Sequence, residues 1–422
     1  MKHFFILAAL LATTTISGCQ AFTTDDEGEK LTPSERHDIT LTKAQQEYVK
    51  AGNTFSYKLF GQVLKENSGS LMLSPLSVEY ALAMLCNGAA GATQEEILNL
   101  LGYKAGEMAD VNEFCKYLTK ELLAADNTVS ISLANALIAN SAMARLKKGY
   151  TSVLENYYDA LIKGYDFKID NAAALSYINK WAEDKTNGMI KDLLDNLDPK
   201  TYLLLMNAIY FKGNWAGNVT FDKKKTQTGK FTKESGAKED VDYMNQEIKN
   251  TYSYSETTLY QSLSLPYGNG AFSMSVYLPL EGKTVGDVLA SLQTDNPPSY
   301  TYSGLANVKL KMPKFATENK INLKGTLASL GMKTAFSKIE ADFSELAEDP
   351  TYVDFIFQKS RIKVYEEGTE AAAVTVVGMY FATIAYPQEP KNVEFYATRP
   401  FLYIIRETST GAILFMGKYD GK

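Results

Sequence analysis

The chain has 422 residues, of which 45% are hydrophobic and 12% aromatic, and this is enough apolar material for a large buried core. The formal net charge of −6 argues against a nucleic-acid partner and against adsorption to an anionic membrane surface.

Histidine and cysteine usage narrows the possible chemistry further. The only histidines are His3 and His37, so the sequence beyond them cannot supply a Ser-His-Asp or Cys-His catalytic system. The three cysteines show no C-x-x-C spacing, which argues against a zinc site. Cys86 and Cys115 lie in apolar, helix-like sequence, and we interpret them as buried thiols rather than a disulfide. We therefore expect no enzyme activity, no metal and no cofactor.

The first residues are typical of a secretion signal. A positive start is followed by an apolar run over residues 4–11, which is too short to span a bilayer. Residues 16–19, Ile-Ser-Gly-Cys, resemble a lipobox, so we expect a lipoprotein signal peptide over residues 1–18 and lipid on Cys19. A signal peptide with a chance cysteine is the alternative. The lipid would be the only membrane attachment, at a bacterial cell envelope, periplasmic or surface-exposed.

Residues 19–40 are polar and acidic, which predicts a flexible tether. Helical spacing of apolar residues follows over residues 41–64, and Ser74-Pro75 predicts the start of a helix that runs to Cys86. Thr93 to Glu96 matches a capping box ahead of a helix that ends at Leu101. Further along, the pattern predicts a strand over residues 129–139, a helix over 172–186, and a strand over 201–212 that is buried on both faces.

The second half of the chain is rich in predicted strands. They cover residues 261–265, 273–280, 308–315, 354–365 and 401–406, and one helix interrupts them at residues 323–330. No internal repeat and no linker occurs between about residue 41 and residue 422. We therefore expect one large α+β domain over residues 41–422, and a monomer.

The most informative segment lies between two of these strands, over residues 366–394. It begins with two glutamates, a glycine and then mostly small residues, and alternate side chains from Thr369 to Met379 are uncharged. Such a segment could enter a sheet as a strand without burying a charge on that face, yet the prolines behind it are typical of a loop. An ordinary edge strand followed by a turn is the alternative.

Several motifs in chain order resemble one protein family. Residues 366–373, Glu-Glu-Gly-Thr-Glu-Ala-Ala-Ala, are similar to the hinge of inhibitory serpins. Residues 207–215 resemble the central strand of that family, and residues 395–401 with 411–417 resemble its carboxyl-terminal motif. The resemblance implies a mainly antiparallel central sheet, two smaller sheets, eight or nine helices and an exposed reactive loop. The implied hinge residues are Glu366, Glu367, Gly368, Thr369, Glu370, Ala371, Ala372 and Ala373.

The resemblance also implies a function, the irreversible trapping of proteases by insertion of the cleaved loop into the central sheet. Counting from the hinge glycine places the scissile bond between Ala382 and Thr383, with Tyr380 and Phe381 as alternative cleavage positions. Elastase-like, subtilisin-like or chymotrypsin-like serine proteases would fit these residues. No lysine or arginine occurs between Lys363 and Lys391, which argues against trypsin-like targets. Cysteine proteases stay open as a further target class.

Two polar groups follow from the same resemblance. Ser74, Ser77, Asn207 and Gln358 fall where serpins hold a buried cluster that lets the sheet open, with Gln358 in place of the usual histidine. We expect Lys314 to pair with Glu366 as a latch at the top of the sheet near Trp215, the alternative being two independent surface charges. A serpin fold without inhibition, as a carrier, chaperone or surface binding protein, is the alternative function.

Overall fold

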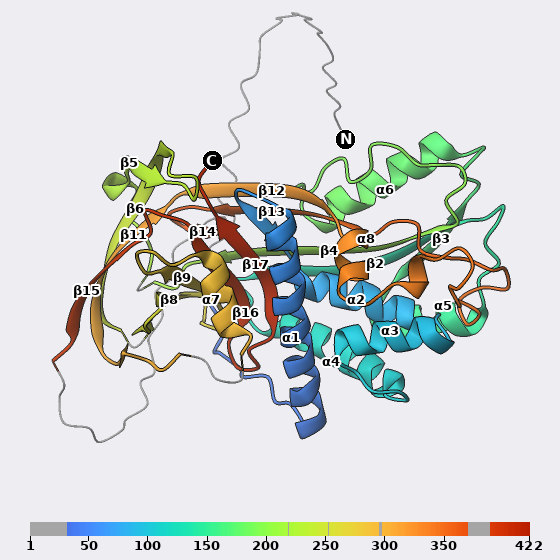
Figure 1. The fold of residues 1–422 in the computed structure, drawn as a ribbon, viewed down its shortest axis with the longest axis horizontal. Coiled ribbons are helices and arrows are strands. Elements are labelled where there is room, and N and C mark those ends of the chain that lie inside the picture. Colours follow the sequence, from blue (N-terminus) through green and yellow to red (C-terminus); the bar gives the residue numbers. More distant parts are fainter. Residues whose placement is uncertain (1–31, 218, 252, 295–297, 370–388) are drawn as a thin grey trace, which may run out of the picture. The chain divides into compact units, whose positions relative to one another are not determined.

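The computed structural model describes residues 32–217, 219–251, 253–294, 298–369 and 389–422. These residues contain eight α-helices. The helices are α1 (Lys43–Glu66), α2 (Pro75–Cys86), α3 (Gly91–Leu101), α4 (Met108–Ala124), α5 (Lys148–Tyr158), α6 (Asn171–Lys185), α7 (Val285–Leu292) and α8 (Lys324–Ser329). Helices and mainly antiparallel sheets are combined as expected, so the α+β prediction is confirmed (Figure 1).

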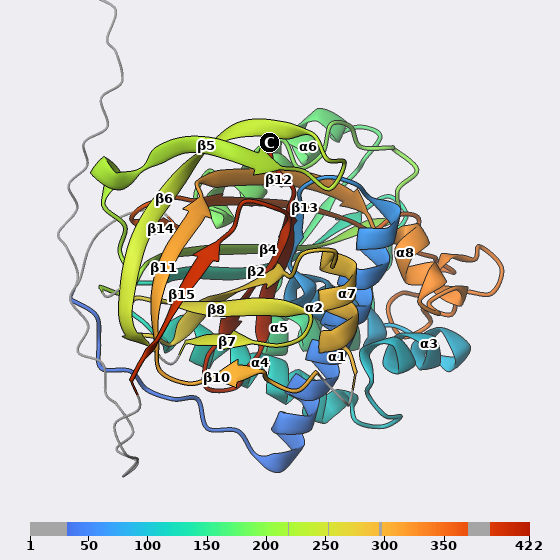
Figure 2. The same cartoon turned by 60° about the vertical axis from the view of Figure 1, so that its left-hand side comes forward.

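Seven strands form the largest continuous sheet. Its order is β1 (Leu71–Leu73), β17 (Ile413–Tyr419), β16 (Phe401–Glu407), β9 (Phe272–Pro279), β8 (Tyr260–Tyr267), β7 (Tyr254–Glu256) and β10 (Tyr302–Ser303). A second sheet has the order β15 (Lys391–Tyr396), β11 (Ala306–Pro313), β6 (Lys238–Thr251) and β5 (Gln227–Thr232). Figure 2 shows β15 at the outer edge of this sheet, beside β11.

The expected central sheet is divided into two ladders. One ladder has the order β14 (Gly368–Thr369), β4 (Leu203–Asn214), β2 (Ser130–Asn140) and β3 (Leu161–Tyr165). The other pairs β12 (Phe315–Asn322) with β13 (Phe357–Val364). The strand predicted over residues 201–212 is therefore central in its ladder, flanked by β14 and β2.

Both faces of β4 are covered, but unequally. On one face Leu204, Met206 and Ala208 are buried in a cluster with α6. On the other face Leu203 and Leu205 are only half-buried and pack toward the core that includes α2. The prediction of full burial on both faces of this strand is therefore wrong for the face toward α2. Figure 1 shows α2 and α6 on opposite sides of β4.

The capping box expected at residues 93–96 is not present. Helix α3 begins at Gly91, and its N-cap residue Ala90 has no side chain that could accept the capping bond. Thr93 instead accepts a hydrogen bond from the backbone N–H of Asp342, and Glu96 accepts from the backbone N–H of Thr334. The two polar side chains therefore cap a segment that is distant in sequence.

The described part of the expected tether lies against the folded body. The backbone N–H of Ser34 donates to Asn127 at 2.8 Å, and that of Ile39 donates to the Ser409 hydroxyl at 2.9 Å. The buried thiols Cys86 and Cys115 are both free, as expected. Among the described residues, no helix combines the length and hydropathy needed to cross a membrane.

Candidate functional site: a divided sheet and its hinge

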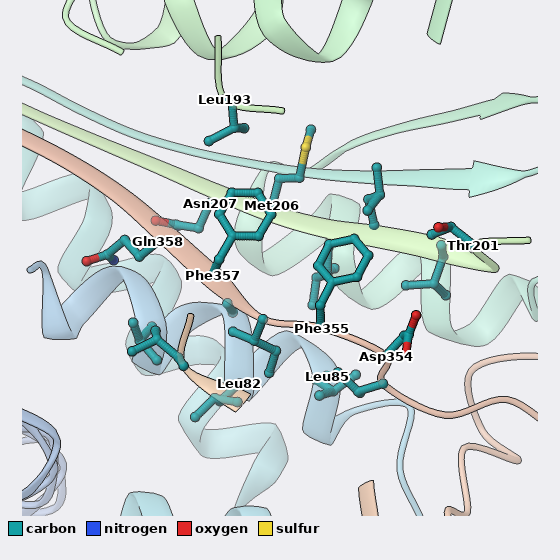
Figure 3. Close-up of a pocket in the computed structure, with 18 of the residues that line it drawn as sticks. Leu82, Leu85, Leu193, Thr201, Met206, Asn207, Asp354, Phe355, Phe357 and Gln358 are labelled. Atoms are coloured by element: carbon teal, nitrogen blue, oxygen red, sulfur yellow. The ribbon is translucent and has the colours of Figure 1, made fainter. Parts of the chain in front are cut away.

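A cleft separates the two ladders of the central sheet. In the described part of the chain no ladder joins β4 to β13. A cavity of about 130 Å³ lies between them and is closed from below by α2. Figure 3 shows its lining, which includes Leu82, Leu85, Leu193, Met206, Phe355 and Phe357. An engineered apolar cavity of roughly 150 Å³ is large enough for benzene, so this space is substantial for a protein interior.

We call the end of the cleft at the carboxyl ends of β4 and β13 its upper end, and a further strand already occupies it. Gly368 and Thr369 form β14, which pairs antiparallel with Asn214 and Gly213 of β4. The backbone of Tyr365 and that of Gly368 exchange hydrogen bonds of 3.0 and 3.1 Å, which closes a tight turn between β13 and β14. The chain thus leaves β13, turns, and begins a new strand beside β4.

Gly368 is required for this turn. Its φ is +135°, a backbone conformation that residues with a side chain rarely adopt. A Cβ atom at this position would lie 2.5 Å from Cα of Asn214. The hinge glycine therefore permits both the turn and the close approach of β14 to β4.

Glu366, inside the turn, is held by an ion pair and a hydrogen bond. Its carboxylate lies 3.0 Å from Nζ of Lys314 and accepts a bond of 2.7 Å from the hydroxyl of Thr226. Only 3% of the Glu366 side chain is exposed. Burial acts to raise its pKa, but the Thr226 hydroxyl and Lys314 outweigh burial and hold the pKa below the usual carboxyl range. Glu366 is therefore a charged group fixed in the turn.

Trp215 lies at the same end of the cleft. Its Nε1 donates to the carbonyl of Tyr365 at 3.0 Å, and its backbone N–H donates to the carbonyl of Glu367 at 3.1 Å. Its ring stacks on Tyr267, with 4.6 Å between the centroids. The structure thus brings Lys314, Glu366 and Trp215 together at the turn.

The polar cluster expected below the sheet is assembled in part. The side-chain amide of Gln358 makes two bonds to the backbone of Ser74, accepting from its N–H at 2.7 Å and donating to its carbonyl at 3.0 Å. The Ser74 hydroxyl donates to Leu414 and accepts from the backbone N–H of Ser77. Gln358 therefore ties β13 to the start of α2.

Asn207 is not bonded to this cluster. Its Nδ2 donates to Asn135 at 2.5 Å, and its buried Oδ1 has no hydrogen-bond partner among the described residues. Asn207 and Gln358 nevertheless both line the cleft (Figure 3).

Three members of these networks were not predicted from the sequence: Thr226, Asn135 and Ser360. The Ser360 hydroxyl donates to Gln358 at 3.0 Å. Its spacing of two residues from Gln358 along a strand could have indicated a shared face. Thr226 and Asn135 carry no such local signal, because their partners lie on other elements.

Several expected site residues lie outside the described residues. They are the hinge residues Glu370, Ala371, Ala372 and Ala373, the cleavage positions Tyr380, Phe381, Ala382 and Thr383, and the lipidation residue Cys19.

Comparison with known proteins gives the family. The sequence model described as serpin (serine protease inhibitor) matches residues 50–420. The chain belongs to the serpin family. It is 33% identical to Iripin-2 of Ixodes ricinus over 389 residues. This alignment covers 90% of this chain and 96% of Iripin-2.

Solved serpin structures share the fold. The native state of tengpin, a thermophilic serpin, matches with a TM-score of 0.76 and 27% identity, over 93% of this chain and 98% of tengpin. Human thyroxine-binding globulin in complex with thyroxine matches with a TM-score of 0.72 and 26% identity, over 89% of this chain and 98% of that chain. The family thus includes both protease inhibitors and a ligand-binding protein.

Proposed function

We propose that this serpin is an irreversible suicide-substrate inhibitor of proteases, with no catalytic activity of its own. The observation that carries the proposal is the pairing of β14 with β4 at the upper end of the cleft. Because this pairing already begins a strand between the two ladders, cleavage of the loop beyond Thr369 would free that strand to lengthen down the cleft.

The trap uses the chemistry of the target protease. The active-site serine of the protease attacks the carbonyl carbon of Ala382, the peptide bond to Thr383 breaks, and the amine of Thr383 leaves with a proton. The protease is then held as an ester on Ala382. Insertion of the loop into the central sheet moves the attached protease along the sheet before water can hydrolyse the ester. The strain stored in the native fold drives this insertion.

The register of β14 gives the geometry of insertion. Gly368 lies opposite Asn214 and Thr369 opposite Gly213, so the next residues would lie in turn opposite Lys212, Phe211 and their predecessors in β4. About a dozen residues joining the ladder at ~1 kcal/mol net per hydrogen bond would make the step irreversible. The apolar lining of the cleft favours the small uncharged side chains that alternate along this segment.

The residues near the proposed cleavage position define the targets. Alanine at position 382 suits the small apolar pocket of elastase-like or subtilisin-like proteases, and cleavage after Tyr380 or Phe381 would suit chymotrypsin-like proteases. The loop offers no basic residue for a trypsin-like pocket. Cysteine proteases form acyl-enzymes as well and stay a second target class.

We also propose that the mature protein is a monomer held by lipid on Cys19 at a bacterial cell envelope, periplasmic or surface-exposed. Residues 1–18 would be removed as the signal peptide. The contacts of Ser34 and Ile39 with the body would limit the free part of the tether to residues before about 32. The inhibitor domain would then include the segment from residue 32 onward.

A serpin-fold carrier or surface binding protein is the second candidate function. The similarity to thyroxine-binding globulin, solved with thyroxine bound, favours it. Small uncharged residues in the hinge favour the inhibitor.

The test is to mix the mature chain with pancreatic elastase, chymotrypsin or subtilisin and to analyse each mixture on denaturing gels. A complex stable to heat and detergent would support the trap. A released peptide whose mass matches a fragment that begins at Thr383 would support the proposed cleavage position. Cleavage of the loop by all three proteases without a stable complex would contradict inhibition and favour the carrier. A catalytically inactive protease with its serine replaced is the control and should give no stable complex.

A further inference from the structure

One carboxyl group of the helical layer is buried without a cation. Glu79 of α2 is 4% exposed, and its side chain packs against α1 at Gly52. A Cβ atom on Gly52 would lie 2.6 Å from Oε2 of Glu79. The carboxyl group therefore fills the space that a side chain at position 52 would take.

Glu79 has a single polar partner among the described residues. The Tyr103 hydroxyl donates to its Oε1 at 2.5 Å. None of the ion pairs formed by the described residues includes Glu79, so a charge on this carboxylate would be stabilised by one hydroxyl group alone. An ionised carboxylate in such surroundings is costly, whereas the protonated acid is not.

The neighbours of Glu79 do not titrate near neutral pH. They are Tyr103 after α3, Tyr80 on α2 and Cys115 on α4, while Gly52 of α1 lies against the carboxyl group. Burial raises the pKa of both tyrosines and of the thiol, so all three stay neutral and protonated. Any change of charge in this cluster between pH 5 and 8 therefore belongs to Glu79.

The direction of the effect follows from burial. Burial raises the pKa of Glu79 to about 7 from its ordinary value of 4.5, and the Tyr103 hydrogen bond opposes this rise only in part. The folded protein keeps the proton where the unfolded chain has lost it. The resulting stability is fully present below pH 4.5, is lost as the pH rises toward 7, and changes no further above that.

Helix α2 connects this cluster to the cleft. Ser77, Val78 and Leu82, on the same helix as Glu79, line the cavity between β4 and β13. The packing of α2 against α1 therefore affects the position of the side chains that line the cleft.

We propose that Glu79 is a proton-controlled switch that tightens the packing of α1, α2 and the Tyr103 segment at acid pH and loosens it above neutrality. Protonation removes the buried charge, and the neutral acid keeps its contact with Tyr103 and Gly52. The switch concerns the stability of the uncleaved fold and does not depend on the proposed inhibition.

The test is chemical denaturation of the full chain from pH 5 to 8.5, comparing the parent with Glu79→Gln. Glutamine keeps the shape but carries no charge at any pH. The folding equilibrium constant of the variant, relative to the parent, is expected to rise on the order of a hundredfold between pH 5 and 8.5. Glu95→Gln is the matched control, because Glu95 is exposed on the neighbouring helix α3, and this variant should show no comparable rise relative to the parent.

Tyr103→Phe provides a second variant should Glu79→Gln fail to fold. Loss of the hydroxyl removes the one hydrogen bond that stabilises the carboxylate, so the pH at which stability is lost should move upward. A ratio for Glu79→Gln that is independent of pH, or an unchanged pH profile in Tyr103→Phe, would overturn the proposal.

Discussion

The Glu366 carboxylate lies 3.0 Å from the Lys314 ammonium group, and the two ends of this ion pair differ in exposure: 3% of the Glu366 side chain is exposed and 46% of the Lys314 side chain. Glu366 also lies within the turn that leads from β13 into β14. The ion pair therefore links a buried charge in the turn to β11 and β12, whose strands flank Lys314.

Replacing Glu366 by glutamine should lower the free energy of unfolding by about 1–3 kcal/mol, because the charge-assisted contacts with Lys314 and Thr226 are lost. Thermal unfolding at pH 7 measures this. The control is Glu367→Gln, whose carboxylate pairs with the exposed Lys223 and should change stability by about 0–1 kcal/mol. Equal losses in the two variants would contradict a special role for Glu366.

The same pair predicts a pH dependence. Burial disfavours the charge on Glu366, but Thr226 and Lys314 hold its pKa below the usual range. Its contribution to stability is full above the ordinary pKa of 4.5 and is lost as the pH falls through the lowered value. The stability difference between the parent and Glu366→Gln should therefore shrink progressively below pH 4.5, and a difference that grew there would be evidence against the assignment.

Gly368→Ala should disrupt the turn that starts β14. The added Cβ would meet Cα of Asn214 at 2.5 Å, and alanine disfavours a φ of +135°. We expect a loss of about 1–3 kcal/mol in unfolding experiments, together with more loop cleavage for each molecule of protease inhibited. Gly325→Ala is the matched control, because nothing lies within 4 Å of a Cβ there and alanine favours helix α8, so it should lower neither stability nor inhibition.

Gln358→Leu tests the contact between β13 and α2. The substitution leaves the buried N–H of Ser74 without its partner, which costs about 1–3 kcal/mol, while the Ser74 carbonyl keeps the N–H of Val78 as a donor. Urea denaturation should show a lower midpoint. Gln227→Leu, on the exposed side of β5, serves as control. An equal drop of the urea midpoint in this control would mean that the added leucine, rather than the lost hydrogen bonds to Ser74, lowers the stability.

Ala382→Arg should change the target class. A basic residue at the proposed cleavage position fills the acidic pocket of trypsin, so the variant should form a detergent-stable complex with trypsin that the parent does not form. Ile384→Arg places the same charge two residues further on and should leave trypsin uninhibited. Trapping by both variants or by neither would place the scissile bond elsewhere.

Local sequence predicted five of the eight helices and seven of the seventeen strands that the structure describes, and it missed α4, α5 and α7. Ser74-Pro75 fixed the start of α2 because proline at the first helical position needs no N–H partner and the serine hydroxyl accepts the capping bond. The alternating apolar residues of β8 and β9 predicted those strands for the same kind of local reason. Strand β6, Lys238–Thr251, was not predicted, because charged residues at its exposed positions obscure the few buried ones.

Local sequence patterns did not predict side-chain roles that depend on distant partners, and the Lys314–Glu366 pair was predicted only through the family resemblance. Thr93 and Glu96 have the spacing of a capping box, yet each accepts bonds from a segment more than 200 residues away. The sequence around Glu79 likewise does not predict that its carboxyl group is buried without a cation. The packing of this group against Gly52 is seen only in the tertiary structure.

The sequence by itself determined the type and place of part of the elements, the hinge composition and the family resemblance, because propensity, capping and alternation act over a few residues. Only the tertiary structure decided that the central sheet is divided between β4 and β13 and that the hinge has begun a strand at the upper end of the cleft. Pairing between strands that are distant in sequence depends on which backbones meet in space, and no local pattern specifies that.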